Sequence, residues 1–500
     1  MSEIIDQLYE LRSNFIVIGL TGRTGSGCST VADLLSTETF EEFNAPIPTQ
    51  GDNISNDDRK YRITYNYFNG TDNWKNFTVI RASDIITLFV LKHEYDHFLG
   101  YLREIRKNEN LSLSEDFKAE YLKMYQDAKR TIDFIDKKTY KIDIDELFQN
   151  VSQVIVDQYG NSRNLVNLKS KLTEEHKKEF EFVLNFLNER LYTFSITLKK
   201  QLYGGEKNKS FSEYQLWGDN IREFGQALPK KDSKNKYKLS SLAEYMNSII
   251  KIMRAYNNKF RQDKDDITRI VIDSLRNPYE ILYFRERYSA FYTISINTEE
   301  EERQRRLYKI GFNDESIDKL DKKEYPDKDI FADVYSKQHI QRCIELSDIH
   351  IVNPYDKGEE KHYLKRQLVT YTSLMMHPGI VPPTPIERSM QIAYTAKLNS
   401  GCISRQVGAS ITDEKFSLKS IGWNNTPEGQ TPCLMRNLED LLTSNDKSAY
   451  SKYELSDRKF RNSLRNVQLE LDKARYKEVL NGSNLSYCFK DMYSLNENLG

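Results

Sequence analysis

The sequence contains few cysteines, and none of them has the spacing of a zinc site. No C-x-x-C pair occurs, and no histidine follows His377. The five cysteines are Cys28, Cys343, Cys402, Cys433 and Cys488. Such scattered cysteines form neither a disulfide framework nor a zinc-binding pattern, and this usage is typical of a reducing compartment. We therefore expect a cytoplasmic protein.

Neither sign of charge dominates, and long apolar runs are absent. Lys and Arg number 73 against 74 Asp and Glu, for a net charge of -1, so no overall basic field argues for nucleic-acid binding. The longest apolar runs, 15–20 and 85–91, are far shorter than the roughly 20 residues that span a bilayer. The N-terminus is acidic where a signal peptide is basic. We expect no membrane partner, and the 500 residues predict about three domains.

Proline is absent between Pro48 and Pro229. Apolar residues recur at helical spacing through 83–107, 114–136 and 172–203, and again at 242–256. This pattern predicts a long α-helical insertion of several antiparallel helices, which we assign to residues 93–265.

Basic residues gather at two places in this insertion, Lys199-Lys200 and 230–238. A charge run of this kind usually marks a solvated surface, and contact with RNA is the alternative hypothesis.

A glycine-rich loop follows the first buried strand, 15–20, and precedes an apolar helix that includes 31–35. Strand, loop and helix in this order are the required context of a P-loop, in which backbone N–H groups surround a phosphate. The spacing G-x-x-x-x-G-x-S is met. We predict a site for ATP or a deoxynucleoside triphosphate, with Mg²⁺, formed by Gly22, Gly25, Gly27, Cys28, Ser29 and Thr30.

Cys28 stands where the P-loop pattern requires lysine. That lysine reaches the terminal phosphates, so its absence removes a large part of the charge stabilisation for phosphoryl transfer. The sequence therefore favours nucleotide binding over kinase or ATPase activity. The alternative is a structural loop that binds nothing.

A second kinase-like block begins with the apolar strand 270–273, which ends in Asp273. An acid at this position is the form of the Walker B residue that positions Mg²⁺. A later helix carries Arg303, Arg305 and Arg306, and the order of elements resembles the nucleoside and nucleotide kinase group of P-loop proteins. Alternatively, Asp273 caps the next helix and the arginines form a solvated face.

Alternating strands and helices predict a doubly wound parallel sheet over 1–92 and 266–358, an α/β fold interrupted by the helical insertion.

The insertion also contains the pattern H-E-x-x-H at His93-Glu94-Tyr95-Asp96-His97. On a helix this spacing places two zinc ligands on one face, with the glutamate as general base. The charged Asp96 is unusual for a protease, and Glu115 and Glu120 are the available third ligands. Two half-exposed helix histidines are the favoured interpretation.

The stretch from Pro385 to Cys433 predicts a helix followed by a hairpin. Proline at the first turn and an apolar face ending at Ser400-Gly401 predict a helix of about four turns. A strand over 407–411 and a second over 416–423 follow. The run 424–429 is rich in turn-forming residues and presents its side chains to a pocket. The proline-rich 382–385 marks a rigid junction suited to a domain boundary.

This stretch resembles the first half of a deoxycytidylate deaminase. The resemblance lies in S-R-Q-V-G-A at 404–409, G-W-N-N-T-P-x-G at 422–429, and Cys433. It implies that Asn424 contacts the deoxyribose of a bound nucleotide and that Arg405 lies near its phosphate. Trp423 keeps an aromatic wall, whereas Asn425 replaces a glycine on which the loop's backbone conformation depends. We assign residues 359–500 to this incomplete α/β/α domain.

Zinc deaminases require His-x-Glu and Pro-Cys-x-x-Cys, and neither motif is present. We therefore expect no catalytic residue and no metal ligand in this chain, with the Zn²⁺ ligands downstream of Gly500. A degenerate, non-catalytic domain is the alternative.

The combination of a degenerate P-loop domain, a helical insertion and a deaminase-like C-terminus resembles the antiphage deoxycytidine nucleotide deaminases. Membership of that group implies conversion of dCTP or dCMP to the uracil nucleotide by a Zn²⁺-bound hydroxide. It also implies control by the N-terminal region, assembly into a homo-oligomer and, in some members, inhibition by a small RNA. The competing hypothesis is a nucleotide- or RNA-binding regulator without deaminase activity.

Overall fold

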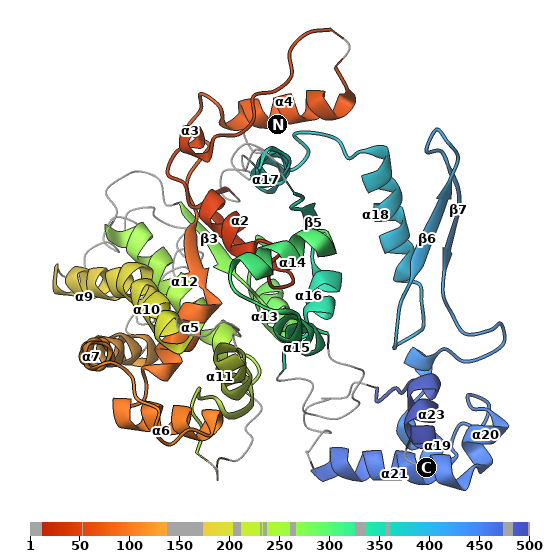
Figure 1. Ribbon diagram of the computed structural model, residues 1–500. Coiled ribbons are helices and arrows are strands. Elements are labelled where there is room, and N and C mark those ends of the chain that lie inside the picture. The colour runs from red at the N-terminus through yellow and green to blue at the C-terminus, as the bar shows by residue number, and fades with distance from the viewer. Residues whose placement is uncertain are drawn as a thin grey trace, which may run out of the picture. The chain divides into compact units, whose positions relative to one another are not determined.

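The chain divides into two compact units, Met1–Val381 and Pro382–Gly500. The computed structural model (Figure 1) describes residues 13–52, 54–137, 174–203, 212–230, 233, 238–260, 267–325, 337–355, 361–473 and 484–498. The division falls at the proline-rich junction. Helix α17 (His362–Met376), which the sequence-based domain assignment grouped with 359–500, therefore belongs to the first unit, where it packs on α4 (Asn56–Phe68).

A five-stranded parallel sheet organises the first unit (Figure 1). The strand order is β2-β3-β1-β4-β5, and every neighbouring pair is parallel. The strands are β1 (Phe15–Thr21), β2 (Thr78–Arg81), β3 (Thr268–Asp273), β4 (Phe291–Asn297) and β5 (Ile349–Val352). The predicted α/β class and parallel sheet are confirmed.

Side-chain alternation along β1 divides the apolar interior into two cores. Ile16 and Ile18 contribute to one core and Val17 to the other, as the two-residue period of a strand requires. The first core is covered by α2 (Cys28–Leu35), α4 and α17. The second is covered by α12 (Ser241–Phe260), α13 (Pro278–Arg287) and α16 (Ile340–Leu346). Both faces of the sheet are therefore buried, as in other parallel sheets.

A run of helices lies between β2 and β3, where the insertion 93–265 was predicted, and its first helix begins directly after β2. The predicted helix over 83–107 is interrupted, because Leu91 ends one helix and Glu94 caps the next. Most of the basic segment 230–238 and part of 172–203 lie outside the described residues. Before α12, the elements are α5 (Ala82–Val90), α6 (Tyr95–Arg106), α7 (Glu115–Lys137), α9 (Glu174–Asn185), the π-helical turn Phe186–Arg190, α10 (Leu191–Tyr203) and α11 (Ser212–Phe224).

Three further helices complete the described part of the first unit. They are α3 (Phe40–Phe43), α14 (Glu300–Lys309) and α15 (Asp314–Glu324). Helix α14 follows β4, so its residues lie near the carboxyl ends of the strands. In the residues that the structure describes, no helix combines the length and the apolar character needed to cross a membrane.

The second unit begins with α18 (Pro385–Lys397), which packs on the antiparallel hairpin of β6 (Gly408–Thr412) and β7 (Leu418–Trp423). Thr384 and Glu387 form a reciprocal capping box at the start of α18, which explains why the helix begins there. The predicted helix and hairpin are confirmed, but Phe416 adopts a left-handed φ of 59° in the turn, so β7 starts two residues later than predicted.

A small separate core follows the hairpin and contains Leu438, Leu441, Phe460 and Leu464. Its elements are the 3₁₀ turn Cys433–Met435, α19 (Leu438–Thr443), α20 (Lys452–Ser456), α21 (Arg458–Lys473) and α23 (Phe489–Asn498).

The packing of α10 predicts that truncating a buried side chain of this helix destabilises the insertion more than truncating an exposed one. Phe194 of α10 is 1% exposed and stacks on Phe117 of α7 with ring centroids 5.8 Å apart. Truncating a buried phenylalanine to alanine costs about 3–5 kcal/mol. Phe194→Ala should therefore lower the free energy of opening of α7 and α10, measured by hydrogen exchange of peptides from both helices.

Ile196→Ala is the matched control, because Ile196 lies on the same helix and is 49% exposed. A surface truncation of this kind changes stability by about 0.5 kcal/mol or less. Equal effects of the two substitutions would contradict the packing described for α10.

Candidate functional site

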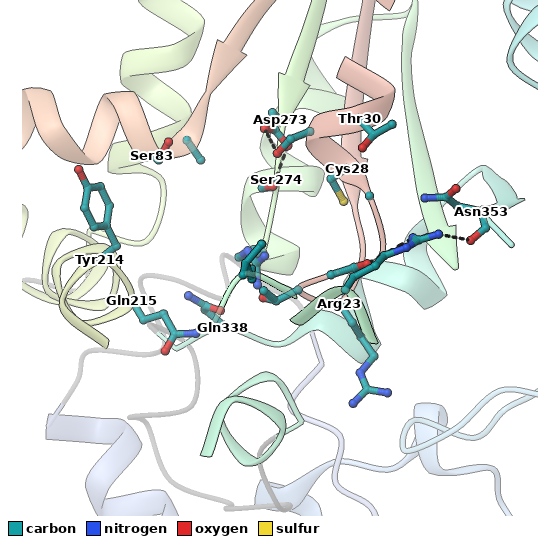
Figure 2. Close-up of a pocket in the computed structure, with 18 of the residues that line it drawn as sticks. Arg23, Cys28, Thr30, Ser83, Tyr214, Gln215, Asp273, Ser274, Gln338 and Asn353 are labelled. Atoms are coloured by element: carbon teal, nitrogen blue, oxygen red, sulfur yellow. Dashed lines mark hydrogen bonds between the residues drawn. The ribbon is translucent and has the colours of Figure 1, made fainter. Parts of the chain in front are cut away.

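The loop between β1 and α2 lies at the carboxyl ends of the parallel strands and lines a cavity of about 820 Å³ (Figure 2). Strands β3 and β4 lie on opposite sides of β1, so the direction in which strands are added to the sheet reverses at β1. Ligands of open α/β sheets bind in the crevice that such a reversal of strand order creates. The position of the cavity is therefore that of a ligand site.

Side chains hold three consecutive carbonyl groups of the loop. Arg303 donates a hydrogen bond to the carbonyl of Thr24 at 3.4 Å. Arg306 donates to those of Gly25 and Ser26, at 3.4 and 3.2 Å. Asn353, which follows β5, also donates to Ser26, at 2.8 Å. Because a trans peptide is planar, each anchored carbonyl directs the next N–H group the opposite way.

Of the N–H groups directed in this way, those of Gly25 and Gly27 are unpaired among the described residues, whereas that of Ser26 donates to the Arg23 carbonyl at 3.0 Å. Within the described part of the chain, the backbone N–H groups of Gly25, Gly27, Cys28, Ser29 and Thr30 donate no hydrogen bond. Unpaired N–H groups at the start of a helix, together with the helix dipole, form an anion-binding site.

Two loop positions require glycine. Gly25 and Gly27 have φ angles of 91° and 108°, in the region that side chains rarely adopt. A Cβ atom on Gly27 would also lie 2.3 Å from Nδ2 of Asn353. Gly22 lies behind the loop, where a Cβ atom would meet the Ile296 carbonyl oxygen at 2.6 Å, and it does not line the cavity.

Ser29 and Asp273 lie side by side at the edge of the cavity. The Ser29 hydroxyl donates to one carboxylate oxygen of Asp273 at 2.8 Å, and the Ser274 hydroxyl donates to the other at 2.8 Å (Figure 2). A P-loop hydroxyl and a Walker B carboxylate are the protein ligands of Mg²⁺ in P-loop enzymes, and oxygen donors suit this ion. The residues therefore fit Mg²⁺.

Asp273 does not cap the next helix, which was the structural alternative. Asn277 is the N-cap of α13, and its side chain accepts a hydrogen bond from the N–H of Tyr279 at 2.9 Å. Ser274 has a left-handed φ of 73°. Such backbone strain in a residue other than glycine is common at functional sites.

Cys28 contributes no charge to the site. Its side chain is 7% exposed, and burial beside the carboxylate of Asp273 raises the pKa of the thiol to about 12. The thiol is therefore neutral at physiological pH. The positive charge that a P-loop lysine brings to the terminal phosphates is missing from this position.

Basic residues outnumber acidic ones around the cavity. The two carboxylates are Asp273 and Glu302. The basic residues are Arg23, Lys199, Arg222, Arg276, Arg305, Arg306, Lys309 and Lys361. A cleft lined by one sign of charge concentrates ligands of the opposite sign, so this cavity is suited to a polyanion such as a polyphosphate.

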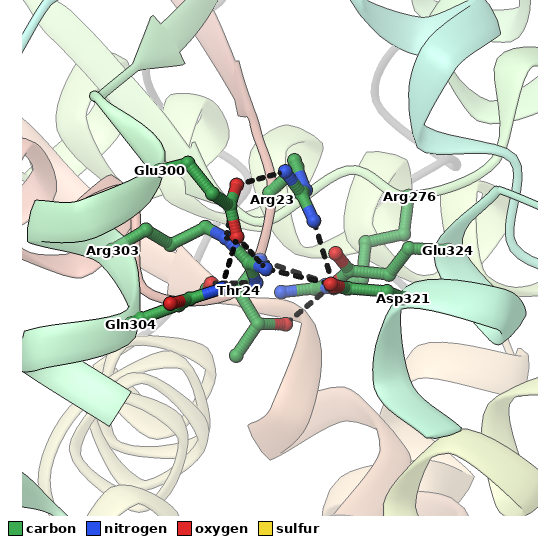
Figure 3. A network of polar contacts seen from close by, with 8 residues as sticks. All are labelled: Arg23, Thr24, Arg276, Glu300, Arg303, Gln304, Asp321 and Glu324. Carbon is green, nitrogen blue, oxygen red and sulfur yellow. Dashed lines mark hydrogen bonds and ion pairs between the residues drawn. The ribbon is translucent and has the colours of Figure 1, made fainter. Parts of the chain in front are cut away.

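Of the arginines of α14, Arg303 is buried and is not part of a solvated face, whereas the side chain of Arg305 is 42% exposed. Arg303 is 1% exposed and pairs with Glu300 and Asp321, at 2.7 and 2.8 Å (Figure 3). Arg305 and Arg306 both pair with the buried Glu302, at 2.7 Å.

Helix α15 also positions the loop. The fully buried Glu324 accepts hydrogen bonds from the N–H and hydroxyl groups of Thr24, the former at 3.0 Å, and pairs with Arg276 at 2.7 Å (Figure 3). Arg23 pairs with Asp321 at 2.8 Å. The loop is thus fixed from one side by side chains of α14 and α15.

No protein-family model, curated protein or solved structure matches this chain. The chemistry of the site is therefore inferred from its own residues. The six predicted residues from Gly25 to Asp273 that line one cavity carry that inference.

The H-E-x-x-H motif does not have the helical geometry of a metalloprotease. His93 and Glu94 precede α6, in which Glu94 is the N-cap, and the Nδ1 atoms of His93 and His97 lie 3.1 Å apart. Burial, with the neighbouring His97 and Lys92, lowers the pKa of His93 to about 4. Among the residues with described structure, no group of three or more potential metal ligands occurs.

Asn424 does not present its side chain to a ligand in the way that the deaminase resemblance implies. Its Oδ1 accepts hydrogen bonds from the Val407 N–H at 2.7 Å and the Ser400 hydroxyl at 3.0 Å. Its Nδ2 donates to the Arg405 carbonyl at 2.7 Å. The amide therefore ties the 400–407 loop to the end of β7. Neither Asn424 nor Arg405 lines the cavities of about 820 and 440 Å³.

Several residues of the site were not predicted from the sequence. Asn353 and Arg276 follow the strands β5 and β3, so their place after a buried strand is a signal that could have found them. Glu324 lies within a polar helix and carries no such signal, and Lys199 was marked in the sequence only as one of two adjacent lysines in the insertion. Their role depends on how distant helices pack.

The environments of two cysteines predict different reactivity. Hydrogen bonds from the backbone N–H groups of Arg405 and Ser404 lower the pKa of Cys402, whereas that of Cys28 is raised to about 12. The thiolate is the reactive form of cysteine. At pH 8, iodoacetamide should therefore label Cys402 before Cys28, as measured by peptide mass spectrometry over time.

The same reaction in denaturant is the control, since all five cysteines should then react alike. Rapid labelling of Cys28 in the folded chain would contradict the buried position of its thiol.

Proposed function

We propose that the first unit binds a nucleoside triphosphate with Mg²⁺ in the cavity at the carboxyl ends of β1 and β3. The observation that carries this proposal is the row of unpaired loop N–H groups beside the Ser29–Asp273 pair. Together they offer donors for phosphate oxygens and oxygen ligands for a divalent cation, within one cavity.

The cavity has room and suitable groups for each part of such a ligand. The phosphates would accept hydrogen bonds from the loop N–H groups, with Arg305 and Arg306 of α14 beside them. The nucleoside would lie against the inserted helices, where Ser83, Tyr214 and Gln215 line the cavity (Figure 2). Bound Mg²⁺ would neutralise phosphate charge beside Ser29 and Asp273.

The chemistry of the loop favours binding over fast phosphoryl transfer. Phosphoryl transfer depends on stabilising the charge that develops on the transferred group. The Cys28 thiol is neutral, and the charges of Arg305 and Arg306 are both paired with the carboxylate of Glu302. We therefore propose a regulatory nucleotide site, through which the first unit responds to the nucleotide pool.

Introducing an acid into the loop tests this proposal. In Gly27→Asp, the carboxylate would repel phosphate, the new Cβ atom would meet Asn353, and φ would be strained. Affinity for Mg²⁺–ATP or Mg²⁺–dCTP, measured by isothermal titration calorimetry on the whole chain, should fall below detection.

Gly100→Asp is the matched control, because Gly100 of α6 is exposed and has open space at its Cβ position. It adds the same charge and should bind nucleotide as the wild type does. If the wild type and Gly27→Asp bind equally, or neither binds, the loop is a structural element and the proposal is wrong.

The Ser29–Asp273 pair makes a separate prediction about the cation. Asp273→Asn removes an ionised oxygen ligand and should weaken ATP binding in the presence of Mg²⁺ by about tenfold or more, which corresponds to about 1.4 kcal/mol. The affinity measured in EDTA should change much less. An equal loss under both conditions would assign Asp273 a structural role instead of a metal-binding one.

For the second unit we propose a deoxycytidine nucleotide deaminase-like domain. What supports this is the helix and hairpin found where the resemblance implies them. The described residues do not fit Zn²⁺, since they contain no group of potential ligands, and we assign no catalytic step to them. The defence role, homo-oligomeric assembly and inhibition by a small RNA that the resemblance implies are parts of this same proposal.

The absence of the motifs His-x-Glu and Pro-Cys-x-x-Cys from the sequence gives a direct expectation for this unit. The chain should hold no stoichiometric Zn²⁺ by metal analysis and should convert neither dCTP nor dCMP to a uracil nucleotide, as followed by chromatography. Turnover by this chain would show that its residues supply catalytic groups that we have not identified.

A further inference from the structure

Most of the positive charges at the cavity are already paired with a carboxylate. Arg23 pairs with Glu300 and Asp321, and Arg276 with Glu324. Glu302 holds Arg305 and Arg306, and Glu280 holds Arg222 at 2.9 Å. The remaining basic residues around the cavity are Lys199, Lys309 and Lys361.

Among these three lysines, Lys199 comes from a different wall of the cavity. Lys309 ends α14 and Lys361 caps α17, helices that follow β4 and β5. Lys199 lies on α10. This helix packs on α5, which begins directly after β2. Strand β2 is next to β3, which ends in Asp273, and the carboxylate of Asp273 acts electrostatically on Lys199.

Lys199 is half-buried at the cavity, and its ammonium group is available to pair with a bound anion. Within the described part of the chain it makes no hydrogen bond and no ion pair, and its Nζ lies 5.0 Å from the centre of the Tyr214 ring. Burial lowers its pKa, while the carboxylates of Asp84 and Asp273 act electrostatically to raise it. An anion in the cavity would therefore be a favourable partner for this charge.

We propose that Lys199 supplies the positive charge that Cys28 does not, so that the inserted helix α10 completes the P-loop across the cavity. This inference rests on the proposed nucleotide site. A lysine has a flexible four-carbon stem that ends in a compact charge with three donors, which suits contact with a terminal phosphate. Nucleotide binding is thereby coupled to the packing of the insertion on the sheet.

A purely structural role for Lys199 is the competing explanation, because Asp84 is buried nearby and its pKa is raised by that burial. The two explanations differ in how the loss of Lys199 should change the affinity for ligands that carry different numbers of phosphates. A lysine that contacts the terminal phosphate matters for the triphosphate and not for the nucleoside. A lysine that only balances Asp84 affects all ligands alike.

The test is isothermal titration of the whole chain with ATP, ADP and adenosine in Mg²⁺. For Lys199→Met we expect at least a tenfold loss of ATP affinity, a smaller loss for ADP and no change for adenosine. Lys200→Met is the matched control, since Lys200 is the exposed neighbour on the same helix, and it should leave all three affinities unchanged. Lys199→Arg should retain most of the ATP affinity.

Two results would overturn the inference while leaving the proposed site intact. One is Lys199→Met binding ATP like the wild type although Gly27→Asp does not bind. The other is an equal loss for ATP, ADP and adenosine. If wild-type chain and Gly27→Asp do not differ in ATP binding, the nucleotide site itself is refuted, and the role of Lys199 with it.

A measurement on the unsubstituted chain gives an answer even if Lys199→Met does not fold. Mg²⁺–ATP should slow the acetylation of Lys199 relative to that of Lys200, as followed by mass spectrometry, because a bound phosphate would cover the first ammonium group only. Equal rates with and without nucleotide would count against the inference, provided that titration shows ATP bound.

Discussion

The phosphate-binding geometry of the first unit depends on the direction in which three loop carbonyls point. Arg303, Arg306 and Asn353 hold these carbonyls, and planarity of the peptide then directs the following N–H groups the other way. The anchoring residues follow the loop by 279 to 327 positions in the sequence. Glycines allow the loop to adopt this conformation, but residues of α14 and the segment after β5 select it.

The anchors bring charge into the interior, and the acids around them limit its cost. An isolated buried guanidinium loses its hydration, and a single ion pair rarely restores all of that free energy. Arg303 therefore shares two carboxylates, Glu300 and Asp321, as well as its bond to the loop. Since Asp321 and Glu300 also pair with Arg23, these groups form one network, in which each arginine has two carboxylate partners (Figure 3).

Local sequence features were sufficient to predict the frame of the first unit. The apolar run of β1, the glycines after it and the acid at the end of β3 have direct physical consequences, and each was found where expected. Glu324 and the role of Lys199 could not be predicted, because the sequence of a helix does not indicate which distant loop or cavity the helix will meet. Asn424 shows the opposite error. Its turn was predicted, but its amide bonds to Ser400, Arg405 and Val407 instead of being left free for a ligand.

The strand order has a consequence for how the chain acquires its structure. Strand β3 lies between β1 and β2, yet the whole insertion, 82–267, separates it from both of them along the chain. At a translation rate of 5–20 residues per second, β1 and β2 wait roughly ten to forty seconds on the ribosome for the strand that joins them. Both apolar strands remain without their partner during that time, a state prone to aggregation. The topology thus leaves β1 and β2 without their shared neighbour until the chain has been made as far as Asp273.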